Sequence, residues 1–146
     1  MQIFLGGTTG SSTWRKEMAI PILESAGVSY FNPQLGQDEW TAEHQKKEAT
    51  AKEKAAVWLF VITDESRGIA SLVEAAYRIG CGGKIALAIM DVTEATTIEG
   101  KPLTKDEIKD LNRGRAYLRE IAEQHHIKVY TDIRSATKHA IELIGS

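Results

Sequence analysis

The sequence has few of the features that place a protein in a membrane or crosslink it. Its 146 residues include one cysteine, and no hydrophobic run approaches the roughly 20 residues of a transmembrane helix. A single cysteine cannot form a disulfide within the chain, which favours a reducing compartment, so we expect a cytoplasmic protein. The short apolar N-terminus has no basic leader, and we therefore expect no signal peptide.

The chain also has no strong excess of positive or negative charge. The net charge of −2 provides no basic surface for nucleic acid or for an anionic membrane, so we expect neither as a partner. The four histidines do not follow a metal-ligand spacing, which predicts that the protein holds no metal. The cysteine, Cys81, has no basic neighbour in the sequence that would activate it, and we expect it to be structural.

The length suits one domain with its own core, which we place at residues 1–146. Strand-like and helix-like segments alternate along it. Apolar runs predict five strands, at residues 2–5, 28–31, 57–62, 85–90 and 127–130. The segments after them predict five helices, at residues 13–26, 42–56, about 69–80, 104–125 and 132–145. Because Pro21 falls inside the first of these helices, we expect a kink or a late start there.

This alternation predicts an α/β fold with a parallel sheet and helices on both faces. The common winding of five such strands is the flavodoxin-like, doubly wound order 2-1-3-4-5, in three layers. In that order strands 1 and 3 are neighbours, and the switch point lies between them. The loops that follow these two strands, residues 6–12 and 63–68, are the richest in Gly, Ser and Thr. Winding and composition therefore predict the same ligand cleft.

The first of these loops suits contact with a phosphate or a ribose. It includes Gly6, Gly7, Thr8 and Thr9. Glycines let the backbone approach a ligand closely, and the N-terminus of the next helix favours an anion. Arg15 lies in the first turn of that helix, where it can pair with a phosphate. The alternative is a flexible turn with Arg15 on a solvated face, because the loop matches neither a P-loop nor GxGxxG.

Glu74 is the candidate catalytic group. It lies near the start of the helix that follows the third strand, at the edge of the sheet where ligands bind. A fixed, ionised carboxylate there suits nucleophilic attack on an anomeric carbon or stabilisation of an oxocarbenium-like centre. Two alternatives remain open. Ser71 and Glu74 have the spacing of a capping box, and Glu74 and Arg78 have the i, i+4 spacing of a surface ion pair.

Other polar and aromatic residues fall near the same cleft. Asp64 and Glu65 end the third strand, and one of them can hold a sugar hydroxyl, orient Glu74 or protonate a leaving base. We favour Asp64, which is nearer the strand end, although aspartate is also common in turns. Asn32 follows the second strand and Trp40 opens the second helix, so both are candidates for contact with a base, Trp40 by stacking.

Several short motifs follow one another over roughly residues 1–90. They are Thr13-Trp14-Arg15-Lys16-Glu17, Ile20-Pro21, Tyr30-Phe31-Asn32-Pro33, Trp40-Thr41, Glu48, the run Trp58–Thr63, and Gly68 followed by Ser71-x-x-Glu74. No one motif is specific, but together they are fairly specific, and in this order they resemble the nucleoside 2-deoxyribosyltransferase-like family, within its poorly characterised branch.

The resemblance implies a flavodoxin-like fold and chemistry at a nucleoside N-glycosidic bond. Glu74 occupies the position of the family's nucleophile, while Gly68 and Ser71 belong to the motif around it. The implied activity is base removal from, or base exchange on, a (deoxy)nucleoside or its 5′-monophosphate through a glycosyl-enzyme intermediate. It also implies no metal or organic cofactor, and a homo-oligomer in which a neighbouring chain supplies part of the site.

Two other functions stay open at this point. One is a TIR-like NAD glycohydrolase, since that group also uses a helical glutamate and the segment Leu23–Gly27 is similar to it. The other is a nucleotide-binding or sensing module without activity. It is supported by differences from the characterised enzymes around Glu74: a longer spacing from Gly68, the pair Ala75-Ala76 in place of a glycine, and Ala70 in place of an aromatic residue.

Overall fold

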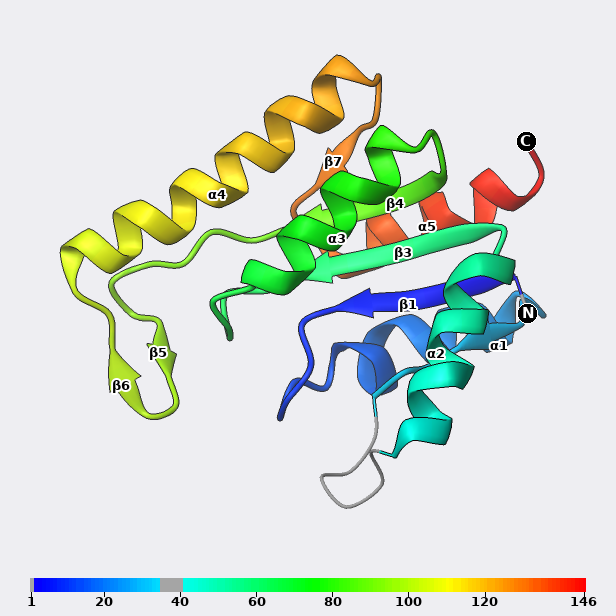
Figure 1. The fold of residues 1–146 in the computed structure, drawn as a ribbon, viewed down its shortest axis with the longest axis horizontal. Helices are drawn as coiled ribbons and strands as arrows, with labels where there is room; N and C mark the ends of the chain where they lie inside the picture. The colour runs from blue at the N-terminus through cyan, green and yellow to red at the C-terminus, as the bar shows by residue number, and fades with distance from the viewer. Residues whose placement is uncertain (1, 35–40) are drawn as a thin grey trace.

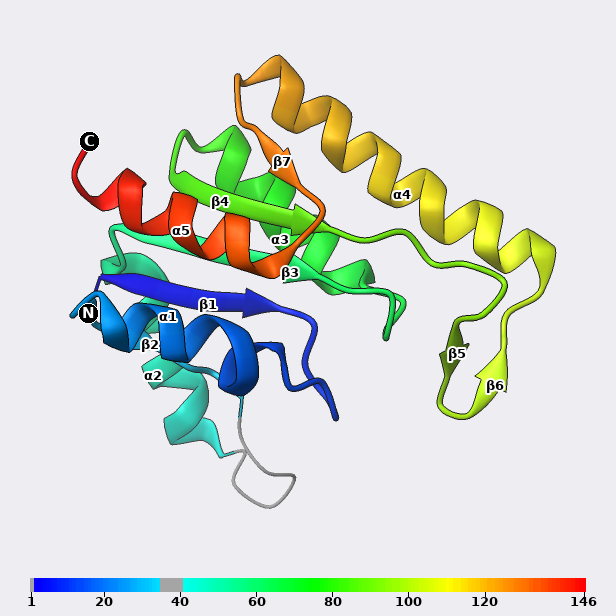
Figure 2. The ribbon, with the colours of Figure 1, turned by 180° about the vertical axis from the view of Figure 1, so that it is seen from behind.

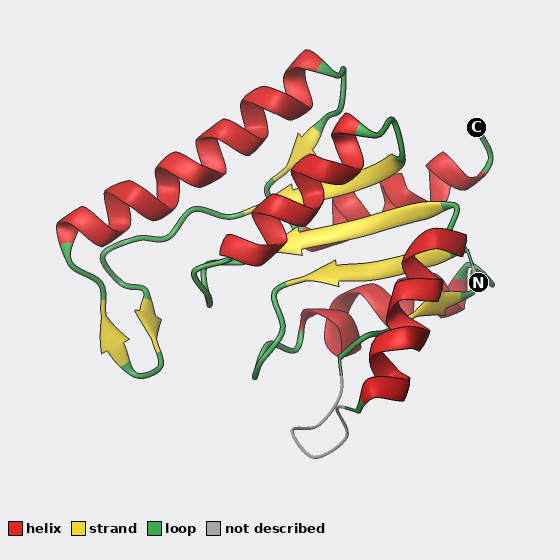
Figure 3. Cartoon of the chain, viewed as in Figure 1, coloured by secondary structure: helices red, strands yellow, loops and turns green. Residues whose placement is uncertain are grey.

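The computed structural model describes residues 2–34 and 41–146 and has an α/β architecture (Figure 3). Five strands form the main sheet: β1 Ile3–Gly7, β2 Tyr30–Phe31, β3 Val57–Ile62, β4 Lys84–Ile89 and β7 Val129–Tyr130. The α-helices are α1 Ile20–Ser25, α2 Ala42–Lys54, α3 Ile69–Gly80, α4 Lys105–Gln124 and α5 Ile133–Ile144. A π-helical turn, η1 Arg15–Ala19, precedes α1 directly.

All strand pairs of the main sheet are parallel, in the order β2-β1-β3-β4-β7. This is the predicted flavodoxin-like order, with β7 as the fifth strand. Strands β1 and β3 pair directly, with Gly6 opposite Phe60 and Gly7 opposite Val61. Their carboxyl ends, and therefore the two loops that follow them, lie side by side as the winding predicts.

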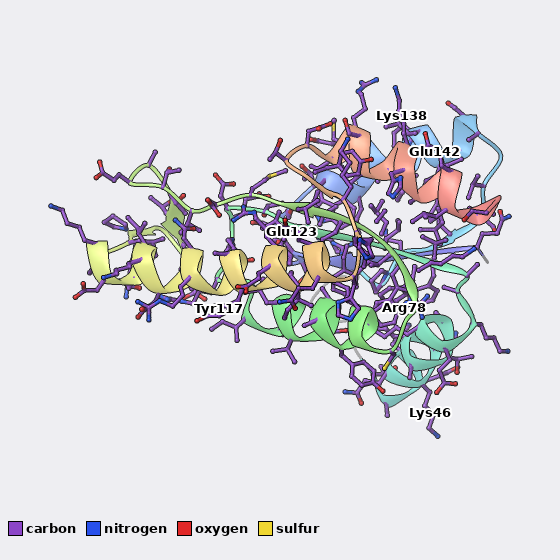
Figure 4. All side chains as sticks on the ribbon, turned by 90° about the horizontal axis from the view of Figure 1, so that it is seen from above. Lys46, Arg78, Tyr117, Glu123, Lys138 and Glu142 are labelled. Carbon is purple, nitrogen blue, oxygen red and sulfur yellow. The ribbon has the colours of Figure 1, made fainter. Side chains whose placement is uncertain are left out.

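Helices cover both faces of the sheet, which gives three layers (Figures 1 and 2). Seen from above, α2 and α3 lie on one side of the sheet and α5 on the other (Figure 4). Alternate residues of each strand supply the two cores. Phe60 and Leu87 pack toward α2, α3 and α4, whereas Leu59 and Ala86 pack toward α1 and α5. The buried strand β3 is apolar throughout because both of its faces are covered.

Polar residues begin two of the helices as the sequence predicts. Thr104 and Glu107 form a complete capping box at the start of α4, and the Asp132 side chain accepts a hydrogen bond from the Ser135 amide at the start of α5. At Pro21 the expected interruption takes the form of a change in helix type. The π-helical turn ends at Ala19, and Pro21 lies in the first turn of α1, where its missing N–H is tolerated.

Two segments differ from the sequence expectation. Gly6 and Gly7, expected in a loop, extend β1, because their backbones pair with β3 and a strand needs no side chain for that. The expected connection 91–103 contains a small antiparallel hairpin, β5 Thr97–Ile98 and β6 Lys101–Pro102, which projects away from the main sheet (Figure 1). None of the helices in residues 2–34 and 41–146 has the length and apolar character that crossing a bilayer requires.

Candidate active site

A cleft of about 690 Å³ opens over the carboxyl-terminal part of β1 and β3, with residues of α2 and α3 on its walls. Phe4, Gly6 and Phe60 are among the residues that line it from the sheet. The first loop borders the cleft on one side, and Glu74 of α3 lies on its wall. The structure therefore brings the glycine loop and the candidate nucleophile to one concave site.

Aromatic rings pack along the sheet under this cleft. The rings of Phe4 and Phe31 stack with centroids 5.9 Å apart, and those of Trp58 and Phe60 stack at 5.4 Å. Gly6 makes this packing possible, since a Cβ on Gly6 would lie 2.0 Å from the Phe60 ring. The rings form a rigid apolar floor under the cleft, of the kind that suits a flat heterocycle.

Glu74 is held by a lysine of the neighbouring helix. The Lys52 Nζ of α2 donates a hydrogen bond of 2.6 Å to Glu74 Oε2 and lies 3.3 Å from Glu48 Oε1. The Glu74 side chain is 39% exposed, so a ligand in the cleft can reach it. Two carboxylates thus share one ammonium group on the wall of the cleft.

Burial on its own would lower the pKa of Lys52, but the hydrogen bonds and charges of Glu74 and Glu48 outweigh it, and the pKa is raised. Lys52 is therefore protonated throughout the physiological range. The protonated amine of Lys52 therefore orients the Glu74 carboxylate on the wall of the cleft.

Both alternatives for Glu74 are wrong. The N-cap of α3 is Gly68, so Glu74 lies in the second helical turn and cannot cap, and its carboxylate contacts Lys52 instead. Arg78 does not pair with it either, because its guanidinium donates to the Lys84 and Ala56 carbonyls and lies over the Trp58 ring. The Glu74 carboxylate is therefore held on the cleft wall by Lys52.

Arg15 is fully buried, which excludes a solvated face. Its guanidinium donates to the carbonyls of Leu5 at 3.0 Å, Thr8 at 2.6 Å and Gly7 at 3.4 Å. Burial lowers the pKa of Arg15 to about 10, and the charge of Glu48 partly opposes that shift. Arg15 still lines the cleft, but most of its donors hold the end of β1 and the first loop rather than facing a phosphate.

The first loop is also tied to the loop after β3. The buried Thr8 hydroxyl accepts a hydrogen bond of 2.9 Å from the Thr63 amide, so Thr8 links the two loops, and it lines a hollow between them rather than the cleft. The Ser12 hydroxyl donates to Glu65 Oε1 at 2.9 Å. Gly7 and Thr9, in contrast, line the cleft as expected.

The structure favours Glu65 over Asp64 as the acid nearer the first loop. Glu65 lines a second hollow of about 530 Å³, which lies between the two loops. Asp64 lines neither this hollow nor the cleft, and its charge acts on the buried Arg115 on the α4 side. The sequence favours Asp64 because it is nearer the end of the strand. It does not show in which direction the side chain points, and this is why the expectation differs from the structure.

Of the remaining candidate site residues, some line the two hollows and one lies in a local turn. Ser71 lines both hollows, and Gly68 lines only the second. The Asn32 side chain accepts a hydrogen bond from the Gln34 amide in a local turn, and Asn32 is not among the cleft residues. Trp40 lies outside the described residues.

Among the charged and polar residues of the cleft, the sequence singles out neither Lys52 nor Gln34, and it singles out Glu48 only through the family resemblance. Lys52 and Glu48 lie four residues apart on α2, whose alanine, lysine and glutamate content indicates only a solvated helix. Gln34 donates to the Gly10 and Ser12 carbonyls and thereby fixes the first loop from the β2 side. Two sequence signals point to the pair: Glu48 belongs to the family motifs, and Glu48 and Lys52 have the i, i+4 spacing of an ion pair.

Within residues 2–34 and 41–146, no three His, Cys, Asp or Glu side chains gather as a metal site would require. Cys81 is exposed and forms no disulfide.

Comparison with known proteins identifies the family of the chain. The family described as nucleoside 2-deoxyribosyltransferase like matches residues 1–92, which hold β1, α2, β3, α3 and the whole lining of the cleft. The match covers more than half of the chain, and the chain belongs to this family. A search of curated proteins found no match.

Proposed function

We propose that this protein breaks the N-glycosidic bond of a (deoxy)nucleoside or its 5′-monophosphate, with Glu74 as the nucleophile. The observation that carries the proposal is the position of Glu74, whose partly exposed carboxylate is held by Lys52 inside the cleft bordered by the first loop. Family membership supports a nucleoside as the substrate.

In the proposed first step, a carboxylate oxygen of Glu74 attacks the anomeric carbon while the bond from that carbon to the base nitrogen breaks. The base leaves with the bonding electrons and takes a proton from water. The sugar is then an ester of Glu74. Water then attacks the anomeric carbon of this ester, loses a proton to the solvent and releases the free sugar. Alternatively, a second base attacks the same carbon and loses its proton to form a new nucleoside, and either step restores the carboxylate.

Lys52 has a role in both steps. Its ammonium group orients the Glu74 carboxylate before attack and stabilises the negative charge that returns when the ester is cleaved. Glu48 holds the same ammonium from the other side, so Lys52 stays in place while Glu74 is esterified. Phe4 and Phe60 offer the apolar surface on which a base can rest.

The test is base release from a panel of ribonucleosides, deoxynucleosides, their 5′-monophosphates and NAD, each with and without a second free base. We expect release of base from at least one nucleoside or monophosphate. Nicotinamide release from NAD alone would favour the TIR-like alternative. Saturable binding without turnover at any enzyme concentration would favour a sensing module and contradict the proposal.

Replacing Lys52 by glutamine is expected to lower kcat for base release about 10-fold to 100-fold, because the carboxylate loses the charge that orients it. The matched control is Lys47→Gln on the same helix, where the lysine is exposed and pairs only with Glu43 at 3.8 Å. Rates measured under saturating substrate should be unchanged for the control. A Lys52→Gln rate within twofold of the original protein would remove Lys52 from the mechanism.

A further inference from the structure

Two buried arginines lie beneath the two loops that flank the cleft. Arg15 binds the carbonyls at the end of β1, as described above. Arg115 of α4 does the same for the loop after β3, and its side chain is fully buried as well. Unlike Arg15, Arg115 lies beyond the segment that matches the family.

All five N–H groups of Arg115 donate to backbone carbonyls. In the loop after β3 the acceptors are Thr63 at 2.8 Å, Ser66 at 3.0 Å and Arg67 at 3.1 Å. Met90 at the end of β4 accepts at 2.8 Å and Leu111 at 3.4 Å. One side chain therefore joins α4, the end of β4 and the loop from β3 to α3.

These contacts determine the path of the chain into α3. The Ser66 and Arg67 carbonyls are turned toward Arg115 immediately before Gly68, the N-cap of α3. Gly68 has a φ of 73°, and a Cβ there would lie 3.5 Å from Arg115 Nη2 and 3.1 Å from the Ile62 side chain. The positive φ favours glycine at the point where the helix begins, and a Cβ there would be tight against Ile62 but only in ordinary contact with the guanidinium.

Burial is the main cause that lowers the pKa of Arg115, and the charge of Arg119 adds to it. The charges of Asp91 and Asp64 act in the opposite direction. A buried guanidinium costs free energy unless its donors are satisfied, which here requires the loop carbonyls to stay in place. The loop and the arginine therefore hold each other in one arrangement.

We propose that Arg115 is a positioning residue for Glu74. By fixing the carbonyls before Gly68, it sets the direction of α3, and so places the Glu74 carboxylate in the cleft within reach of Lys52. This inference rests on the proposed function of Glu74. It assigns the C-terminal part of the chain a role in the site, although that part contributes no residue to the cleft lining.

The test compares Arg115→Lys and Arg115→Gln with the control Arg119→Gln. Arg119 lies one turn further along α4, pairs with Asp91 at 2.8 Å and makes no contact with the loop after β3. For the Arg115 variants we expect kcat to fall 10-fold to 100-fold with KM within about threefold, since a displacement of about 1 Å has that effect. Arg115→Lys should retain more activity than Arg115→Gln, because it keeps the charge but not the five donors.

Hydrogen exchange and a double variant separate this proposal from the function of Glu74. Exchange of the amides in 64–71 should quicken in Arg115→Lys and not in Arg119→Gln, whether or not the protein has activity. If the original protein releases no base but exchange is faster in Arg115→Lys, the proposed function is rejected and the effect of Arg115 on the loop stands. If Glu74→Gln is inactive but folded Arg115→Lys keeps the original kcat and exchange, the positioning role is rejected. Adding Arg115→Lys to Glu74→Gln should lower residual activity no further.

Discussion

Replacing Glu74 by glutamine is expected to abolish base release, with kcat at least about 10³-fold below that of the original protein. Glutamine has nearly the same size and can still accept a hydrogen bond from Lys52, but its amide oxygen is a poor nucleophile and forms no glycosyl ester. KM and the affinity for nucleosides should change little, because Glu74 is only one of the residues that line the cleft. Steady-state rates measure kcat and KM, and the intact mass of the acid-quenched enzyme shows whether the glycosyl ester has formed.

The control for this experiment is Glu53→Gln. Glu53 is exposed on α2, next to Lys52 in sequence, and does not line the cleft. Its activity and its mass after quenching should match those of the original protein. A Glu74→Gln variant that releases base at the original rate would exclude covalent catalysis by this residue, and only the fold and the family would then stand.

Replacing Gly7 by alanine is expected to destabilise the fold by about 3 to 5 kcal/mol. A Cβ on Gly7 would lie 2.0 Å from the backbone oxygen of Val61 on the adjacent strand, and the φ of Gly7 is +113°, which a side chain disfavours. The obstacle is the backbone of β3, so no rotamer change relieves it. Urea unfolding followed by circular dichroism should show a lower midpoint, or a variant that does not fold.

Gly27→Ala separates the two causes. Gly27 also has a positive φ, +68°, but a Cβ there meets nothing within 4 Å. We expect a loss of only about 1 kcal/mol, from the backbone conformation alone. If the two variants lose the same stability, the close approach of β1 to β3 is not what requires a glycine at position 7.

Local sequence was enough to predict most of the fold. The apolar run Val57–Ile62 is β3 to the residue, because a strand covered on both faces needs an unbroken hydrophobic segment. Thr104 with Glu107 and Asp132 marked the starts of two helices, since capping depends on atoms only a few residues apart. The order of the strands was predicted from the alternation of elements and the common winding of five parallel strands, and the structure has that order. The hairpin in 91–103 was missed because its strands are two residues each.

The site could be predicted only in part. The loop order placed Glu74 and the first loop at one cleft, and the structure agrees. The choice of Asp64 over Glu65 rested on distance along the strand, whereas the direction of each side chain depends on what packs around the loop. Lys52 and Glu48 belong to a helix whose composition resembles a solvated surface, and nothing nearby in sequence shows that one of its faces borders a cleft.

By itself, the sequence determined the alternation of strands and helices, their winding and the family, because these depend on hydrophobic spacing and short motifs. Only the tertiary structure decided what the charged residues do. The sequence marks Arg15 as a candidate for pairing with a phosphate and gives no signal for Arg115, yet both are buried and bind backbone carbonyls. Such contacts join residues up to 52 positions apart for Arg115, so they exist only once the chain has folded.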